Sequence, residues 1–171
     1  MTRRKFTAMI LTGTALASAA VIVPHTIAAG QAGAFRLTAF QQLARDQNVM
    51  TEDAMSNLSG EWQLTHLASY GAGLNAVDES VTDRSQIVIG PDGAFNGTVG
   101  CNRFGTSFDL KGEAIAFDGV MSTRKACQGP VWDAERNLFA ALNRADTHKL
   151  EGGVLTLLDA AGNEIARFTR T

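Results

Sequence analysis

The sequence predicts an α+β fold that is mainly antiparallel β. We expect a small curved sheet or partly open barrel of about seven to nine strands, with one main covering helix and a short N-terminal helical segment. Gly is frequent, at 17 of 171 residues, whereas Pro occurs only 3 times, which favours tight β turns over a helical bundle. Short alternating segments recur after Leu58, and only the stretch around residues 131–142 changes there to a helical period. Because a flat sheet would leave one apolar face bare, the sheet should curl and the helix should cover its open side.

Residues 1–28 have the pattern of a secretory signal peptide. Residues 2–5 read Thr-Arg-Arg-Lys, residues 8–23 carry no charge, and small residues surround Ala28. The alternative is a transmembrane anchor, but the apolar run is shorter than the roughly 20 residues that a bilayer span needs. The basic start also resembles the twin-arginine export signal. We therefore expect a periplasmic or secreted protein, with no stable membrane span after the signal is removed.

The charge balance bears on the class of partner. Removal of residues 1–28 leaves 12 basic and 17 acidic residues, a net charge of about −5. Such a chain is poorly suited to a role built on attraction to nucleic acid or to anionic membranes.

Residues 29–56 differ in composition from residues 57–171 and are expected to form a helical or linker segment. Thr38 stands three residues before Gln41 in a capping arrangement, and Phe40, Leu43 and Ala44 come next at helical spacing. This predicts a short amphipathic helix over residues 38–46 and then a polar connector. A partly disordered leader that docks loosely is the open alternative.

Residues 57–171 carry the strand pattern of one domain. Residues 61–67 alternate strictly, which puts Trp62, Leu64 and His66 on one face. Residues 87–89 and 94–99 flank a Gly-Pro-Asp-Gly turn and predict a hairpin. Further strands are predicted near residues 104–110, 114–117, 120–123, 148–150, 154–158 and 164–169. Between them, one helix is predicted from the apolar stripe Val131, Ala134, Leu138, Ala141 and Leu142.

Cys101 and Cys127 are the clearest candidates for chemistry. Both come after the signal peptide, so an oxidising compartment would permit a disulfide, which is the favoured interpretation. Two free thiols, thiol catalysis and a metal site remain open. A Cys nucleophile would need His66 or His148 as its base, and the spacing of the four residues contains no close pair of metal ligands. Because the sequence also lacks Gly-x-Ser-x-Gly, a phosphate-binding loop and His-Glu-x-x-His, we expect no enzyme, no metal and no cofactor.

Several aromatic residues fall on predicted strands or at the start of the helix. A core role is the simplest interpretation of these positions. A small curved sheet with a helical cover can also leave an apolar cleft that accepts a ligand. The candidates for lining such a cleft are Trp62, Phe104, Phe108 and Trp132.

Five short motifs occur in a fixed order along the predicted domain. They are Leu58-x-Gly60-x-Trp62-x-Leu64, Gly100-Cys101-Asn102-x-Phe104-Gly105-x-x-Phe108, Ser122-Thr123-x-x-x-Cys127, Glu135-x-x-Leu138-Phe139-x-x-Leu142 and Leu155-x-Leu157-x-Asp159-x-x-Gly162. Together they resemble the META domain, the HslJ-like family of bacterial envelope proteins, over about residues 57–168. Phe108 stands where that family often has Tyr, which removes a hydroxyl but keeps the aromatic packing.

The resemblance implies a compact β fold with a covering helix, an exported or membrane-associated location and no established catalytic activity. It links the family to heat-shock response, novobiocin resistance, and motility or secretion. By fold similarity it also points to secretion pilotins that bind apolar ligands or partner segments. Gly100, Asn102 and Thr123 match the family signature, and a structural role suffices for each.

The favoured function is therefore an exported, non-catalytic periplasmic module, related to envelope stress, that binds a protein partner or a small apolar ligand. One alternative is a structural protein of envelope assembly that acts through residues 30–57. The other is a thiol-based redox protein that uses Cys101 or Cys127.

Overall fold

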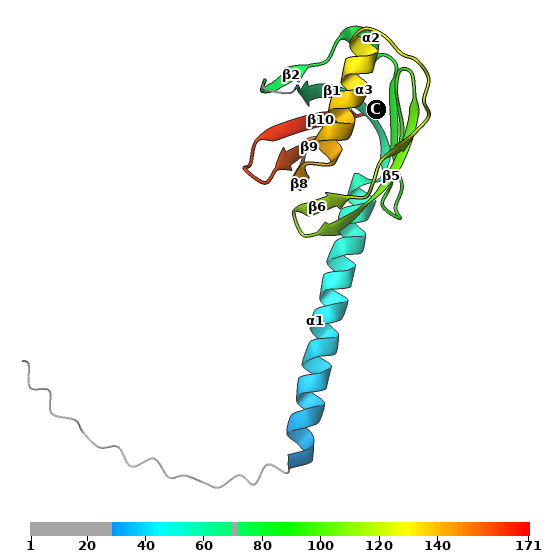
Figure 1. Cartoon of the computed structure of the whole chain (residues 1–171). Coiled ribbons are helices and arrows are strands. Elements are labelled where there is room, and N and C mark those ends of the chain that lie inside the picture. Colours follow the sequence, from blue (N-terminus) through cyan, green and yellow to red (C-terminus); the bar gives the residue numbers. More distant parts are fainter. Residues whose placement is uncertain (1–28, 70–71) are drawn as a thin grey trace, which may run out of the picture. The chain divides into compact units, whose positions relative to one another are not determined.

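The computed structural model describes residues 29–69 and 72–171, with side chains from Phe40 onward. The predicted signal peptide, residues 1–28, lies outside the described residues. The elements are α1 (Ala29–Leu58), β1 (Gly60–Ala68), β2 (Leu74–Ala76), α2 (Glu79–Thr82), β3 (Ser85–Ile89), β4 (Ala94–Val99), β5 (Arg103–Lys111), β6 (Ala114–Phe117), β7 (Met121–Ser122), α3 (Pro130–Leu142), β8 (Ala145–Glu151), β9 (Val154–Asp159) and β10 (Glu164–Arg170) (Figure 1).

The strands form one antiparallel sheet that closes into a barrel. Its order is β10-β9-β8-β6-β5-β4-β3-β1, and β1 also pairs with β10, which joins the two ends of the sheet. The three-residue β2 extends from β1, and the two-residue β7 pairs with β5 outside the closed ring. The predicted fold class is confirmed. The described residues contain ten strands, and pairing of the first and last long strands closes the barrel that the sequence left partly open.

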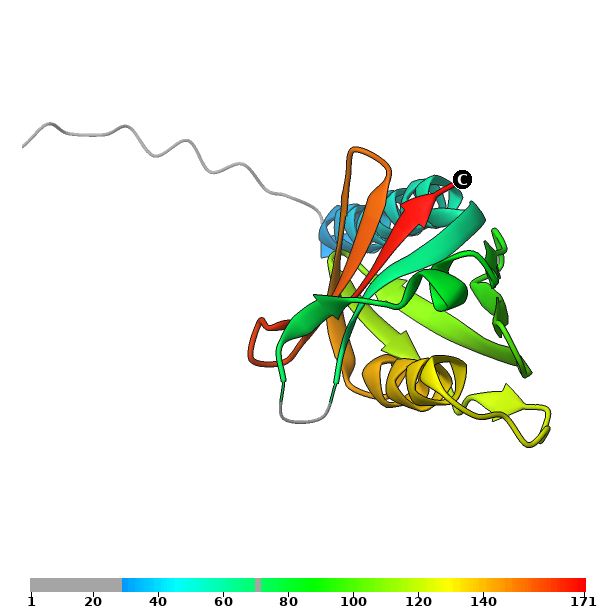
Figure 2. The ribbon, with the colours of Figure 1, turned by 90° about the horizontal axis from the view of Figure 1, so that it is seen from above.

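The barrel interior and one side of α3 share a single apolar core. Trp62, Leu64, Phe95 and Phe168 are fully buried inside the barrel. The helix contributes Leu138 and other small and branched apolar side chains to the same cluster. Figure 2 shows α3 lying along one side of the barrel, so it is the predicted covering helix.

A bulge in β1 changes which residues face this core. The register against β10 shifts between Leu64 and His66. As a result Leu67 turns inward and is buried, whereas His66 is only half-buried, although strict alternation places His66 on the inner face.

The first helix is longer than the sequence predicts. It has 30 residues, and the stretch expected to be a polar connector is helical. Residues 47–58 contain neither Gly nor Pro and are rich in good helix formers, so polarity there indicates an exposed helix surface rather than a loop. At its end Leu58 is buried and Met55 packs against the core. Within the described part of the chain, no helix combines the length and the apolar composition that a membrane crossing requires.

The C-terminal strand fastens the junction between α1 and β1. The Arg170 guanidinium donates hydrogen bonds to the carbonyl oxygens of Ser59, at 2.7 Å, and Asn57. It also lies 4.4 Å from the ring centre of Trp62, in cation–π geometry. Gly60 has φ +135° next to it, and a Cβ at this position would lie 2.5 Å from the guanidinium. Only glycine therefore suits this position.

Candidate functional site

Asn102 is the centre of a buried hydrogen-bond network beside the covering helix. Its backbone N–H donates to Glu135 Oε2 at 3.1 Å, and its side-chain Nδ2 donates to Glu135 Oε1 at 2.7 Å. Its Oδ1 accepts from the Thr123 hydroxyl and from the Lys125 backbone N–H, both at 2.8 Å. One side chain, 1% exposed, thereby ties together the start of β5, the 122–127 segment and α3.

Glu135 is a buried carboxylate in the middle of the apolar side of α3. It is only 4% exposed, so both of its oxygens have lost most of their contact with water. Both oxygens instead accept hydrogen bonds from Asn102, and the described residues contain no buried side-chain nitrogen or oxygen atom without a partner. Because a buried carboxylate needs such partners, we expect few other residues to be tolerated in place of Asn102.

The two cysteines join the same two segments covalently. Cys101 and Cys127 form a disulfide with their Cα atoms 6.3 Å apart, which is the pairing that the sequence favours over free thiols. The Asn102 Nδ2 lies 3.2 Å from the Cys127 sulfur. Gly100, directly before the disulfide, has φ +119°, and a Cβ there would lie 3.1 Å from the Arg84 Cβ and 3.3 Å from Val131 Cγ1. These contacts and this backbone angle account for a glycine at this position.

The two histidines considered as bases make local contacts. The half-buried His66 has its Nδ1 3.1 Å from the Thr65 hydroxyl. His148 on β8 has its Nδ1 3.0 Å from the backbone carbonyl of Glu113. Since the disulfide also occupies both sulfurs, the four residues do not form a thiol and base pair in this structure.

A pocket of about 520 Å³ lies between the 122–127 segment and α3, and we call it the disulfide pocket. Trp132 and Phe139 provide its aromatic surface. Phe139 in turn packs edge-to-face on Phe104, with ring centres 5.5 Å apart, so one wall continues into the core. Asn102, Glu135 and Cys127 also line it, together with the basic residues Arg124, Lys125 and Arg136.

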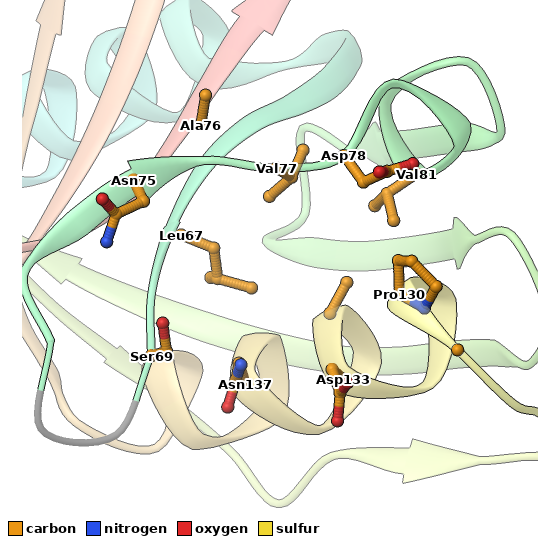
Figure 3. A pocket seen from close by; sticks show the side chains of 12 residues that line it. Leu67, Ser69, Asn75, Ala76, Val77, Asp78, Val81, Pro130, Asp133 and Asn137 are labelled. Carbon is orange, nitrogen blue, oxygen red and sulfur yellow. The ribbon is translucent and has the colours of Figure 1, made fainter.

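A second pocket, of about 400 Å³, lies between α3 and the paired strands β1 and β2, and we call it the hairpin pocket. Figure 3 shows Asp133 and Asn137 of α3 on one wall, opposite Leu67 and the start of α2. Asp78 lies on that opposite wall, where it caps α2. Hydrogen bonds from the hydroxyl and the backbone N–H of Ser80 hold the pKa of Asp78 below its ordinary value. This carboxylate is therefore charged at neutral pH, and no basic residue is among the described residues that line the hairpin pocket.

The four aromatic residues proposed for an apolar cleft have two different locations. Trp62, Phe104 and Phe108 are 1%, 5% and 4% exposed and belong to the core. Trp132 is 41% exposed and lines the disulfide pocket. Closure of the barrel explains the difference, because inward side chains of a closed barrel pack on one another.

Sequence reasoning missed Glu135 as a network residue and the three basic residues of the disulfide pocket. A signal for Glu135 was present, because it lies four residues after Val131 on the same side of the helix as the apolar stripe. Arg124 and Lys125 stand between Thr123 and Cys127, but nothing in their spacing shows that α3 brings Arg136 to the same pocket.

The comparisons with known proteins address the fold and the family. An NMR structure of a protein from Burkholderia xenovorans is similar to this chain, with a TM-score of 0.55 and 22% identity, covering 70% of this chain and 88% of that one. A crystal structure of a DUF4847 family protein from Bacteroides vulgatus has a TM-score of 0.47 and 14% identity, covering 66% of this chain and 93% of that one. The first similarity supports the fold alone. No curated protein matches the chain. The model of the META domain matches residues 56–171, well over half of the chain, and this protein therefore belongs to the META domain family.

Proposed function

We propose that this protein is an exported, non-catalytic binding module of the bacterial cell envelope, and that its disulfide pocket holds a small apolar ligand. The observation that carries the proposal is the exposure of Trp132, a large aromatic side chain that is 41% exposed and lines a pocket of about 520 Å³. Small-ligand sites are concave, largely apolar and of this size. An intact disulfide and a META domain are both compatible with an envelope location.

A binding role also suits the polar groups of the pocket. The Glu135 oxygens accept hydrogen bonds from Asn102, and the Asn102 oxygen is already shared by Thr123 and Lys125. Groups engaged in this way hold a wall in place, and a general acid or base would have to give up one of these partners to act. The network thus supports a preformed pocket rather than a reactive one.

The test uses the purified full-length chain and the neutral fluorescent probe 1-N-phenylnaphthylamine. We expect saturable fluorescence enhancement, and about tenfold weaker binding in Trp132→Ala, since a central aromatic anchor commonly contributes that much. Val88→Ala is the matched control, because Val88 is an exposed apolar residue that does not line this pocket. Absence of saturable binding, or equal affinity in Trp132→Ala and Val88→Ala, would reject the proposal, provided that both variants keep the parental melting temperature.

Envelope assembly through residues 30–57 is the competing function. It is favoured by exposed apolar side chains on α1, of which Phe40 is 72% and Met50 73% exposed. Replacement of both by Gln would abolish assembly in the envelope if this function holds. The same replacement would leave probe binding unchanged if the disulfide pocket is the functional site.

A further inference from the structure

The disulfide pocket carries an excess of positive charge in a chain that is acidic overall. The chain has a formal net charge of −2, yet Arg124, Lys125 and Arg136 all line this pocket. Two of these residues come from the 122–127 segment and the third from α3, so the cations approach the pocket from both of its walls. All three side chains are exposed, as expected of groups that could meet a ligand from solvent.

The acidic residues nearby do not cancel this charge. Glu135 is the one acidic residue among the described residues that line this pocket, so three cations against one carboxylate leave a formal excess of two positive charges (3 − 1 = 2). Asp133 lies 4.0 Å from Arg136, and both side chains are more than 60% exposed, so water weakens this pair. Arg124 and Lys125 have no carboxylate within 4.0 Å in the described part of the chain.

The hairpin pocket provides an internal contrast on the same helix. Within the part of the chain that the structure describes, its lining includes Asp78 and Asp133 and no basic residue, so it would favour a cation. The disulfide pocket has the opposite preference together with an aromatic wall formed by Trp132 and Phe139. An apolar surface flanked by cations is complementary to a molecule with an apolar tail and one negative head group.

We propose that the ligand of the disulfide pocket is an anionic amphiphile. Its apolar part packs on Trp132 and Phe139, and its anionic head group is held by Arg124, Lys125 and Arg136. This inference rests on the proposed function, because it names the chemical class of ligand for the same pocket. Arginine and lysine side chains bind both carboxylates and phosphates, so a fatty acid and a lipid phosphate share the required chemistry.

The experiment compares three ligands that have the same tail and different head groups. Calorimetric titration of the full-length chain with decanoate, decan-1-ol and decylamine at neutral pH and low salt measures each dissociation constant. We expect decanoate to bind about tenfold more tightly than decan-1-ol, because two or three partly exposed charge pairs together contribute on that scale. Decylamine should bind most weakly, and higher ionic strength should reduce the preference for decanoate. Decyl phosphate, titrated in the same way, distinguishes a phosphate from a carboxylate head group.

Variants assign the preference to the pocket. Arg124→Gln/Lys125→Gln and Arg136→Gln should each weaken decanoate binding several-fold while leaving decan-1-ol binding unchanged. Lys149→Gln is the matched control, because Lys149 is exposed on β8 and lines neither pocket. If the neutral probe binds but decanoate and decan-1-ol bind equally, the head-group inference fails and the proposed function survives. A preference for decylamine would overturn the inference and point to the hairpin pocket. If neither the probe nor any of the ligands binds, both proposals fail.

Discussion

Replacement of Asn102 by Ala should be among the most destabilising single substitutions outside the apolar core. The side chain makes three hydrogen bonds of 2.7–2.8 Å that alanine cannot make: one to the Glu135 carboxylate, one from the Thr123 hydroxyl and one from the Lys125 N–H. Its longer contacts to the Cys127 sulfur and the Lys125 carbonyl oxygen are left out of the sum below. A hydrogen bond to a charged group contributes about 1.5–3 kcal/mol and a neutral one about 0.5–1.5 kcal/mol. These values sum to a loss of about 2.5–6 kcal/mol of unfolding free energy. The upper part of this range is expected, because Glu135 also remains buried with only one partner.

The measurement is urea denaturation of the oxidised full-length protein, followed by tryptophan fluorescence. Glu135→Gln should cost less, about 1–2 kcal/mol, because no buried charge remains and the Gln oxygen still accepts from the Asn102 side chain, whereas the Asn102 backbone N–H loses its acceptor. If the two residues act through each other, the double variant should deviate from additivity by at least about 1 kcal/mol. Asn96→Ala is the control, because Asn96 is exposed on β4, and its effect should stay within about 0.5 kcal/mol. A loss below about 1 kcal/mol in Asn102→Ala, with the disulfide intact, would refute the reasoning.

Three further predictions concern the disulfide, Arg170 and Asp159. Cys101→Ser and Cys127→Ser should each lower the free energy of unfolding by about 3–4 kcal/mol, measured by thermal or urea unfolding. The double variant should lose little more, because either substitution alone already removes the one disulfide, which spans a sequence separation of 26. Clear additivity of the two losses would contradict a shared bond. Arg170→Ala should cost about 1–2 kcal/mol through its lost carbonyl bonds and ring contact, and Arg170→Lys should recover only part of the loss in the same urea assay. Hydrogen bonds from the Asn163 backbone and side chain hold the pKa of Asp159 below its ordinary value. The charged carboxylate therefore stabilises the fold at every pH above the ordinary pKa of an aspartate, and this contribution is lost as the pH falls through the lower pKa of the folded state. Asp159→Asn should therefore lower the melting temperature at pH 7, and the difference should shrink on acidification; a difference that is constant with pH would count against this origin.

Most of the strands could be predicted because their turns are local. The Gly-Pro-Asp-Gly sequence between β3 and β4 presets the turn angles, and Gly93 at its end has φ +81°. The closure of the barrel could not be predicted in this way. It depends on β1 pairing with β10, for example Trp62 opposite Arg170, across almost the whole domain. No local pattern encodes such a pairing, and the open side that the sequence suggested is closed by it.

The difference between local and long-range information also explains which parts of the candidate site could be predicted from the sequence. Compartment and composition favour the disulfide, and the structure pairs Cys101 with Cys127. Alternation identifies Phe104 and Phe108 as inward-facing, but it cannot tell whether the interior is hollow or packed; in the structure both are packed in the core. The disulfide pocket forms outside the barrel, where the 122–127 segment meets α3. Its lining comes from two separate segments, and no single repeat of apolar residues along the sequence identifies both.

In the 122–127 segment the main chain is held in place, whereas the basic side chains remain available to a ligand. The Lys125 backbone N–H donates to Asn102, and Cys127 is bonded to Cys101, so the main chain of the segment is fixed at both points. The side chains of Arg124 and Lys125 make no hydrogen bond or ion pair within the described residues, and they are exposed at the pocket. A charge held on a fixed backbone loses less freedom when a ligand binds than one on a mobile loop. Reduction of the disulfide should therefore weaken ligand binding even where the barrel stays folded, because it removes one of the two points that fix the wall and leaves every charge in place.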